Sequence, residues 1–401
     1  MTTPLSAYSS EIYLQGVAGI RPAISTDIGA LEDDARAVMK PEPFWYVAGS
    51  AGSGATARAN RAAFDALRLV PRMLNGPGAR DLSTSVLGTT IPAPIITAPV
   101  GVQSIVHPDA ELAVARAAAD LGLPMTLSTV SSFPMEQVAD ASGTGPRWFQ
   151  LYWPNEDDVC VSFLDRAKAS GFSALVVTLD TWMLAWRPHD LDQAYLPFLT
   201  GEGLANYFTD PAFCAPLAQP PASDLPAALM RWLPMFTGTD HSWENLAFLR
   251  EHWDGPILLK GIQRVDDARR AVDAGVQGIV VSNHGGRQVD GAIASLNALP
   301  AIAAAVGDRV EVLFDSGIRS GADIVKALAL GAKAVMIGRP FVYGLALGGQ
   351  DGVRHVLRSL MADLDLTLGL SGHRRAADLT PADLSAAHLG TVAGRPSVSA
   401  H

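Results

Sequence analysis

VEVLFDSGIRSGADIVKALALGAKAVMIGRP, residues 310–340, contains one strand–helix–strand unit. Val310–Phe314 is a short apolar run that ends in the polar turn DSG, and Gly321–Leu330 carries apolar residues at helical spacing. A second apolar run, Ala334–Ile337, ends in the turn GRP. Strands that are apolar on both faces and alternate with helices are typical of a parallel sheet. This stretch therefore predicts a parallel α/β fold.

The same pattern recurs along the chain, where eight apolar runs each precede a polar or glycine-rich turn. They are Ile95–Ala98, Pro124–Leu127, Trp148–Leu151, Leu175–Leu179, Ile257–Leu259, Gly278–Val281, Val310–Phe314 and Ala334–Ile337. Helical spacing occurs between them, in Asp109–Leu121, Asp157–Ala169, Arg264–Ala274, Leu296–Val306 and Gly321–Leu330. Eight such units favour a closed TIM (β/α)8 barrel. An open, doubly wound sheet is the alternative.

The repeat divides the chain into three parts. Residues 1–90 predict an N-terminal helical segment that packs on the barrel, residues 91–380 the barrel, and residues 381–401 a C-terminal tail. Within that tail, 387–401 is small and polar, so we expect it to be loose. The connection 181–256 after the fourth strand is too long for a barrel loop and predicts a lid. Its aromatic residues favour ordered packing: Trp182, Trp186, Tyr195, Phe198, Tyr207, Phe208 and Phe213.

Composition excludes several classes of protein. A formal net charge of −10 and the lack of a Lys/Arg run argue against a nucleic-acid partner. The two cysteines, Cys160 and Cys214, predict reduced thiols rather than a disulfide framework or a zinc site. The first residues do not resemble a signal peptide, and no apolar stretch is long enough for a membrane span. We expect a cytoplasmic enzyme without a metal.

Barrel enzymes carry their active sites at the C-terminal ends of the strands. The residues that follow the predicted strands here are rich in polar and charged side chains. They are Gln150, Tyr152, Thr178, Asp180, Arg187, Lys260, Ser282, His284, Arg287, Asp315, Arg319, Gly338 and Arg339. We therefore expect the chemistry at this end of the barrel.

Two glycine–arginine turns, Asp315–Gly321 and Ile337–Pro340, follow the seventh and eighth strands. Loops at these positions commonly bind phosphate in barrels. Glycine lets backbone N–H groups approach an anion, and the guanidinium groups of Arg319 and Arg339 add forked donors. One such turn would fit an ordinary tight turn with a solvated arginine, but the pair of loops favours a phosphate site.

The segment SNHGGRQ, residues 282–288, places His284 three residues before Arg287. An imidazole can take a proton from a 2-hydroxy acid, and a guanidinium can hold its carboxylate. Arg187 offers a second clamp, and Asp180 can stabilise the imidazolium that forms. Lys260 would place a cation against an electron-rich ring, with an ordinary ion pair as the alternative. A lone histidine is more often structural, but this strand-end setting favours catalysis.

These segments resemble the FMN-dependent 2-hydroxy acid oxidases and dehydrogenases. The similarity runs from Tyr8 to Leu379, and within the family it is greatest to the lactate 2-monooxygenase branch. The motifs that carry it are EIYLQG (11–16), YVAGSAG (46–52), PRML (71–74), FQLYWP (149–154), LDTWMLAWRPHDL (179–191), PFLTG (197–201), NYFTDP (206–211), KGIQRVDDARRAV (260–272), SNHGGRQ, DSGIRSGADIVKALALGA and IGRP. The resemblance departs at Val130, where plant glycolate oxidases carry a bulky aromatic residue, and in the lid between Thr200 and His241.

The resemblance implies a role for each matching position. The catalytic and substrate-binding residues it implies are His284, Asp180, Tyr46, Tyr152, Arg187 and Arg287. Those it implies for FMN are Pro99, Val100 and Gly101 against the flavin ring, Ser128, Gln150, Thr178, Lys260 and Ser282 as polar contacts, and Asp315, Ser316, Gly317, Arg319, Gly338 and Arg339 around the ribityl chain and phosphate. It also implies a homo-oligomer, a tetramer or an octamer.

The implied reaction is oxidation of a small L-2-hydroxy acid, with L-lactate first, by FMN and then dioxygen. If a closed lid retains the oxo acid, the products are acetate, CO₂ and water, as in a monooxygenase. If the oxo acid leaves first, an oxidase releases it together with H₂O₂. The other readings are a family dehydrogenase with another electron acceptor, a non-catalytic flavin-binding barrel and a phosphate-dependent barrel isomerase.

Overall fold

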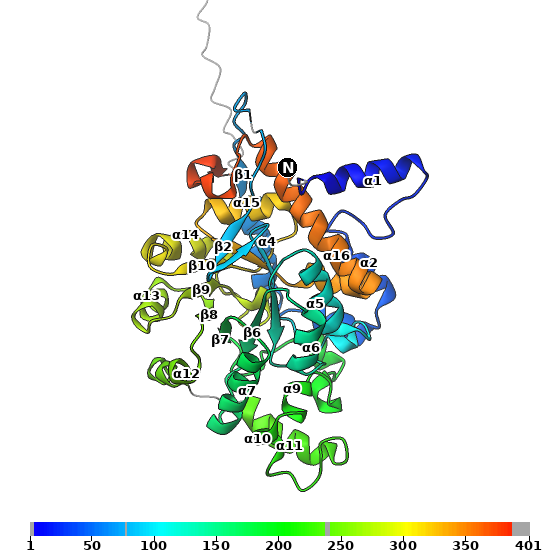
Figure 1. The fold of residues 1–401 in the computed structure, drawn as a ribbon, viewed down its shortest axis with the longest axis vertical. Helices are drawn as coiled ribbons and strands as arrows, with labels where there is room; N and C mark the ends of the chain where they lie inside the picture. Colours follow the sequence, from blue (N-terminus) through cyan, green and yellow to red (C-terminus); the bar gives the residue numbers. More distant parts are fainter. Residues whose placement is uncertain (1–3, 77, 237–240, 387–401) are drawn as a thin grey trace, which may run out of the picture.

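The computed structural model describes residues 4–76, 78–236 and 241–386. Within them, parallel strands close into an eight-stranded barrel in the order β10-β11-β4-β5-β6-β7-β8-β9 (Figure 1). The strands are β4 (Ile95–Thr97), β5 (Met125–Ser128), β6 (Arg147–Leu151), β7 (Leu175–Thr178), β8 (Ile257–Ile262), β9 (Gly278–Val281), β10 (Glu311–Phe314) and β11 (Ala334–Ile337). The predicted TIM barrel is confirmed, and the open sheet is excluded.

Helices surround the barrel, as the alternating pattern predicts. The five predicted from helical spacing are α5 (Ala110–Asp120), α7 (Asp157–Ala169), α13 (Val265–Asp273), α14 (Ser295–Val306) and α15 (Gly321–Ala329). Two more, α6 (Met135–Ser142) and the long α16 (Arg339–Leu370), follow β5 and β11, and α16 is kinked at Gly348 and Gly349. None of the described helices is both long and apolar enough to span a membrane.

The interior of the barrel changes character along its axis. Trp148, Val176, Leu258, Val280 and Leu313 belong to one buried apolar cluster inside the barrel. Side chains alternate along a strand, so the residue two positions further on points to the same side. Those next positions hold Gln150, Thr178, Lys260, Ser282 and Asp315, all of them buried. The barrel is therefore apolar in its first half and polar where the strands end.

A small hairpin closes the amino-terminal end of the barrel. It is formed by β2 (Thr84–Val86) and β3 (Thr89–Ile91), and Val86 and Ile91 are buried in the same inner cluster. The N–H of Leu87 donates to Glu311, the first residue of β10, at 2.8 Å. The expectation of a helical segment for residues 1–90 missed this hairpin, because each strand has a single buried residue and gives no apolar run.

The N-terminal segment otherwise consists of helices, α1 (Ala7–Val17), α2 (Leu31–Val38), α3 (Pro41–Ala48) and α4 (Ala55–Asp65). Helix α2 packs on α16, and α4 lies against the turn that contains His284. Helix α1 extends away from the barrel and has no buried residue (Figure 1). At the other end of the chain, β12 (Leu384–Ala386) pairs antiparallel with β1 (Leu67–Leu69). The first residues of the expected tail are thus ordered, and residues 387–401 lie outside the described part.

The described residues of the predicted lid, 181–236 and 241–256, form short helices between β7 and β8. They are α8 (Pro188–Asp192), η2 (Pro197–Thr200), α9 (Ala205–Phe208), α10 (Pro211–Cys214), α11 (Leu225–Phe236), η3 (Trp243–Asn245) and α12 (Leu246–His252). Of these, α10 and α12 pack on α7. Phe198, Tyr207 and Phe213 are buried, as their aromatic character predicts. Trp182 and Trp186 differ, because half or more of each side chain is exposed.

Candidate active site

A cavity opens at the C-terminal end of the barrel, beneath the lid. Its walls come from the loops after β4, β5, β9, β10 and β11, from α3 and from the start of the lid. The predicted site residues among its lining are Tyr46, Pro99, Val100, Gly101, Tyr152, Arg187, Lys260, His284, Arg287, Asp315, Ser316, Gly317, Arg319, Gly338 and Arg339. The apolar side chains of Val130, Leu184 and Phe198 also line it.

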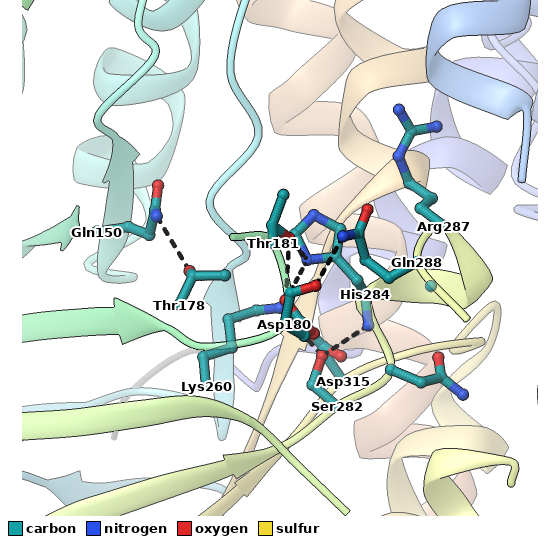
Figure 2. A network of polar contacts seen from close by, with 12 residues as sticks. Gln150, Thr178, Asp180, Thr181, Lys260, Ser282, His284, Arg287, Gln288 and Asp315 are labelled. Atoms are coloured by element: carbon teal, nitrogen blue, oxygen red, sulfur yellow. Dashed lines mark hydrogen bonds and ion pairs between the residues drawn. The ribbon is translucent and has the colours of Figure 1, made fainter. Parts of the chain in front are cut away.

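His284 and Asp180 form a hydrogen-bonded pair at this cavity. Nδ1 of His284 lies 2.8 Å from Oδ1 of Asp180, and the hydroxyl of Thr181 lies 3.1 Å from both atoms (Figure 2). A proton on Nδ1 satisfies the carboxylate and leaves Nε2 as an acceptor. Burial lowers the pKa of His284, although Asp180 acts in the opposite direction. The imidazole is therefore held in the neutral form that a base requires.

Lys260 forms a buried polar centre below this pair. Its Nζ lies 3.0 Å from Asp315 Oδ2 and donates to the hydroxyl of Ser282 at 3.0 Å. Burial alone would lower the pKa of Lys260, but the carboxylates of Asp315 and Asp180 outweigh it and raise the pKa. Lys260 also lines the cavity, so the ion pair and the predicted cation beside a bound ring are both compatible with its position.

A ladder of amide and hydroxyl groups joins the ends of β5, β6 and β7. Oε1 of Gln150 accepts from the hydroxyl of Ser128 at 3.0 Å, and its Nε2 donates to the hydroxyl of Thr178 at 3.0 Å (Figure 2). The backbone N–H of Thr129 also donates to Gln150 Oε1, at 3.2 Å. These bonds fix the orientation of the Gln150 amide beneath the cavity.

Two arginines converge on the substrate end of the cavity. Nε of Arg187 donates to the carbonyl of Arg287 at 3.1 Å, and its second arm donates to Gln288 at 2.7 Å. Arg287 donates to the carbonyl of Gly49 at 2.9 Å and lies over the ring of Tyr46, 5.4 Å from its centre. Burial, together with the charge of Arg287, lowers the pKa of Arg187 to about 10. Two crowded guanidinium groups of this kind favour a bound carboxylate.

Tyr46 and Tyr152 line the same end of the cavity. Burial raises the pKa of both hydroxyls, so both remain protonated and can donate hydrogen bonds. Two phenols and two guanidinium groups together give the site donors for a carboxylate and for a neighbouring oxygen.

The turn between β11 and α16, which also lines this cavity, is suited to an anion. Helix α16 begins at Arg339 with no side chain capping it. Pro340 has no N–H and the N–H of Phe341 donates to the Gly338 carbonyl at 3.2 Å, so the N–H of Arg339 is the donor that lacks a partner within this turn of the helix. A Cβ on Gly338 would meet only Ala98, at 3.8 Å, which leaves room for a ligand at this turn. Burial lowers the pKa of Arg319, and that of Arg339 to about 10. A phosphate would supply the missing charge and the missing acceptor.

Arg339 differs in one respect from the prediction. Its guanidinium donates to the carbonyls of Val47, Gly49 and Gly285 at 2.8–3.0 Å, so it also ties the N-terminal segment to the turn after β9. The residues fit FMN as a group, because an anion site at the Gly338 turn, a buried cation at Lys260 and a base at His284 all border one cavity. They would hold its phosphate near Gly338 and its ring near Lys260.

A family model described as FMN-dependent dehydrogenase matches residues 35–386. The chain belongs to the FMN-dependent dehydrogenase family. FMN is accordingly its cofactor, and it is an FMN-dependent 2-hydroxy acid oxidoreductase. The resemblance inferred from its motifs is confirmed at this level.

Relatives of this chain are named as dehydrogenases and as oxidases. The FMN-dependent alpha-hydroxy acid dehydrogenase qulF of Penicillium citrinum is 49% identical over 376 residues, which cover 93% of this chain and 94% of that protein. An L-lactate oxidase of Lysinibacillus sphaericus is 43% identical over 330 residues, covering 82% and 85%. A crystal structure of mandelate oxidase with (S)-4-hydroxymandelic acid has a TM-score of 0.80 and 39% identity, covering 90% and 98%.

Sequence reasoning missed several residues at this site. Thr181 contacts both members of the His284–Asp180 pair, and Gln288 holds one arm of Arg187. Both stand next to predicted positions, Thr181 after Asp180 and Gln288 at the end of SNHGGRQ, so their place in the motifs was an available signal. Leu184 and Phe198 also lie in the motifs LDTWMLAWRPHDL and PFLTG, but their place in the cavity depends on how the lid folds. Asp180, Ser128, Gln150, Thr178 and Ser282 lie behind the lining rather than in it.

Proposed function

We propose that this chain oxidises a small L-2-hydroxy acid, with L-lactate as the first candidate, and passes the electrons to dioxygen. The observation that carries the proposal is that His284, held by Asp180 at 2.8 Å, lines one cavity with Arg187 and Arg287. One base and two guanidinium groups that can donate to a carboxylate suit an acid that is oxidised at the carbon next to its carboxylate.

The residues would divide the work as follows. Arg187 and Arg287 hold the carboxylate, and Tyr46 and Tyr152 donate to the substrate oxygens. His284 takes a proton at Nε2, and Asp180 stabilises the imidazolium that forms. FMN supplies the two-electron acceptor. The same base serves whether the hydrogen on the carbon leaves as hydride or as a proton, since each route removes one further proton from the substrate.

The cavity has apolar walls that suit an apolar side chain. Val130, Leu184 and Phe198 line it together with Arg187 and Arg287. A methyl group needs no hydrogen-bond partner in such a pocket, whereas a polar substituent would lose its hydration there. This supports L-lactate over an acid with a polar side chain.

The buried lid supports retention of the oxo acid, and with it the monooxygenase outcome. Phe198, Tyr207 and Phe213 pack in the core, so we expect the lid to close over the product. One lactate and one O₂ then give acetate, CO₂ and H₂O. The second candidate is the oxidase outcome, one pyruvate and one H₂O₂ from the same reactants, which the 43% identity to an L-lactate oxidase favours.

Product analysis after aerobic turnover with L-lactate tests this proposal. Acetate and CO₂ in equal amounts are expected, with one O₂ consumed per lactate. Pyruvate with H₂O₂ would replace the monooxygenase by the oxidase. Turnover with a dye but without oxygen consumption would indicate a dehydrogenase. If anaerobic lactate and other short 2-hydroxy acids all failed to bleach the flavin absorbance, the proposed activity would be wrong.

A further inference from the structure

Two of the loops that line the cavity are held against each other. One is the turn after β4, which contains Gly101 and continues into η1 (Gln103–Ile105); the other is the loop after β5, around Val130. The N–H of Val102 donates to the carbonyl of Val130 at 2.8 Å. A Cβ on Gly101 would lie 2.5 Å from that carbonyl and from the Val130 side chain. These two loops therefore have little freedom to separate.

A buried carboxyl group lies behind this contact and belongs to neither loop. Glu111, in the first turn of α5, has an exposed fraction of 0%. Its Oε1 accepts from the N–H of Gln103 at 3.2 Å, from the N–H of Ser132 at 3.1 Å and from the Ser132 hydroxyl at 3.3 Å. A single oxygen thus joins the loop after β4 to the loop after β5.

Two nearby oxygens are left unsatisfied by this arrangement. Among the described residues, Oε2 of Glu111 and Oε1 of Gln103 are both buried and without a hydrogen-bond partner. Both are acceptors when Glu111 is ionised, so neither can satisfy the other. A proton on Glu111 turns its Oε2 into a hydrogen-bond donor, which suits an acceptor such as Gln103 Oε1. It also removes a buried charge, which is costly without a paired cation.

The charged groups on the elements around α5 either have partners other than Glu111 or are exposed. Arg354 of α16 pairs with Asp120 and Asp351, and Glu136 of α6 pairs with Arg166. His107 accepts from the N–H of Asp109, and Asp140 and Arg116 are exposed. Burial is the largest influence on Glu111, and it raises the pKa of the carboxyl to about 7 against the hydrogen bonds from Ser132 and Gln103.

We propose that Glu111 is a positioning residue that acts as a neutral carboxylic acid and clamps these two loops together as one wall of the FMN and substrate cavity. The clamp extends to the lid, because the N–H of Ser104 donates to the Ser132 hydroxyl at 3.0 Å and the Ser104 hydroxyl donates to Glu202. The FMN part of this proposal is independent of the proposed activity, and only the effect on acid binding rests on it.

FMN titration of the apoprotein tests the clamp without any turnover. Glu111→Gln keeps an acceptor for the two N–H groups and supplies a donor that does not titrate. Glu111→Leu removes both and leaves two buried N–H groups unsatisfied. Binding is followed by flavin fluorescence at about pH 6 and about pH 8, on either side of the Glu111 pKa of about 7. Glu251→Gln, at an exposed position of α12, is the matched control.

We expect the Gln variant to bind FMN like the natural protein at the lower pH and more tightly than it at the higher pH. The ratio of the two dissociation constants is the readout, since the titration of the FMN phosphate itself cancels. The Leu variant should bind FMN roughly tenfold more weakly, the scale of a lost buried hydrogen-bond partner.

Two outcomes would overturn the clamp. One is a ratio between natural protein and Gln variant that stays the same at both pH values. The other is a Leu variant that is folded by circular dichroism and binds FMN and the acid normally. If the Leu variant does not fold, the Gln comparison alone decides. A positive FMN result together with no oxidation of any 2-hydroxy acid would instead leave the clamp intact and reject the proposed function.

Discussion

At the scale of single residues, His284 has an unusual backbone conformation, and a hydrogen bond holds it in place. Its φ of 58° is uncommon for a residue with a side chain, and the two residues that follow it, Gly285 and Gly286, also have positive φ. The N–H of His284 donates to the Ser282 hydroxyl at 3.0 Å, which holds the turn in this shape. The turn directs the imidazole toward Asp180, and such retained strain is typical of a functional position.

We expect His284→Ala to lower the rate of flavin reduction by L-lactate by roughly 10²–10⁴, the usual effect of losing a general base. Anaerobic stopped-flow absorbance measures this rate directly. His252→Ala is the control, because the His252 side chain lies on α12 and contacts the carbonyl and ring of Phe248 in the same helix, outside the lining of the cavity. A variant that reduces its flavin at a near-normal rate would remove His284 from the mechanism.

The acid limb of the pH profile should also report on His284. Burial lowers its pKa from 6.5, so the neutral base persists to a lower pH than an ordinary histidine would allow. The rate of flavin reduction should therefore fall only below that lowered pKa. Asp180→Asn removes the opposing carboxylate, so the limb should move to a still lower pH while the plateau drops by at least about tenfold. A limb that moved to higher pH would contradict this role of Asp180.

A third substitution separates substrate binding from FMN binding. Arg287→Met removes a guanidinium beside Tyr46 and leaves the Gly338 turn in place, and Arg339 keeps its bond to the Gly49 carbonyl that the two arginines share. We expect weaker binding of the acid by about 1.5–3 kcal/mol, the range for a charge-assisted hydrogen bond, with little change in FMN affinity. Arg287→Lys should recover part of the loss. Unchanged acid binding and an unchanged rate of flavin reduction in the Met variant would refute the clamp role of Arg287.

At the scale of elements, the strands and their helices could be predicted closely from the sequence. Gly278–Val281 and Ala334–Ile337 coincide with β9 and β11, because a buried parallel strand is apolar throughout and ends abruptly in polar residues. The hairpin β2–β3 was not predicted, since each of its strands has one buried residue, Val86 or Ile91, and so gives no apolar run. The partners of Arg339 escaped prediction for another reason, because backbone carbonyls carry no sequence signal.

The turn between β11 and α16 gives a prediction at this scale. Gly338→Val adds a side chain where only Ala98 lies within 4 Å, at 3.8 Å. We expect the apoprotein to fold with nearly unchanged thermal stability, and its FMN dissociation constant to rise by at least about tenfold as the side chain enters the cavity. Gly16→Val in α1, where nothing lies within 4 Å, is the control. Equal FMN affinity in the two variants would place the phosphate elsewhere.

At the scale of the whole molecule, the lid is fastened to the barrel through Asn206. This buried residue of α9 accepts from the N–H of Met135 at 2.8 Å and donates to the carbonyl of Thr129 at 3.0 Å. The lid therefore rests directly on the loop after β5. The sequence predicted that a lid exists but not this fastening, which depends on residues about 70 positions apart.

We expect Asn206→Ala to loosen the lid, because it leaves the Met135 N–H and the Thr129 carbonyl unsatisfied at about 1–3 kcal/mol each. If lid closure retains the oxo acid, the products should shift from acetate and CO₂ toward pyruvate and H₂O₂. The ratio of pyruvate to acetate after aerobic turnover measures this. Leu199→Ala, at a lid residue that is 55% exposed, should leave the ratio unchanged. An unchanged ratio in the Asn206 variant would mean that lid closure does not decide the outcome.

The change from apolar to polar residues along the barrel axis has a consequence for how this enzyme tolerates mutation. Inward-facing positions two residues apart on one strand, such as Leu258 and Lys260, serve different purposes. Leu258 belongs to the apolar core and Lys260 to the polar site. In a saturation library scored for both cellular abundance and flavin content, the first position of each such pair should fail chiefly in abundance and the second chiefly in flavin content. Substitutions at the polar ends of the strands can then change the site while the apolar half of the barrel stays unaltered.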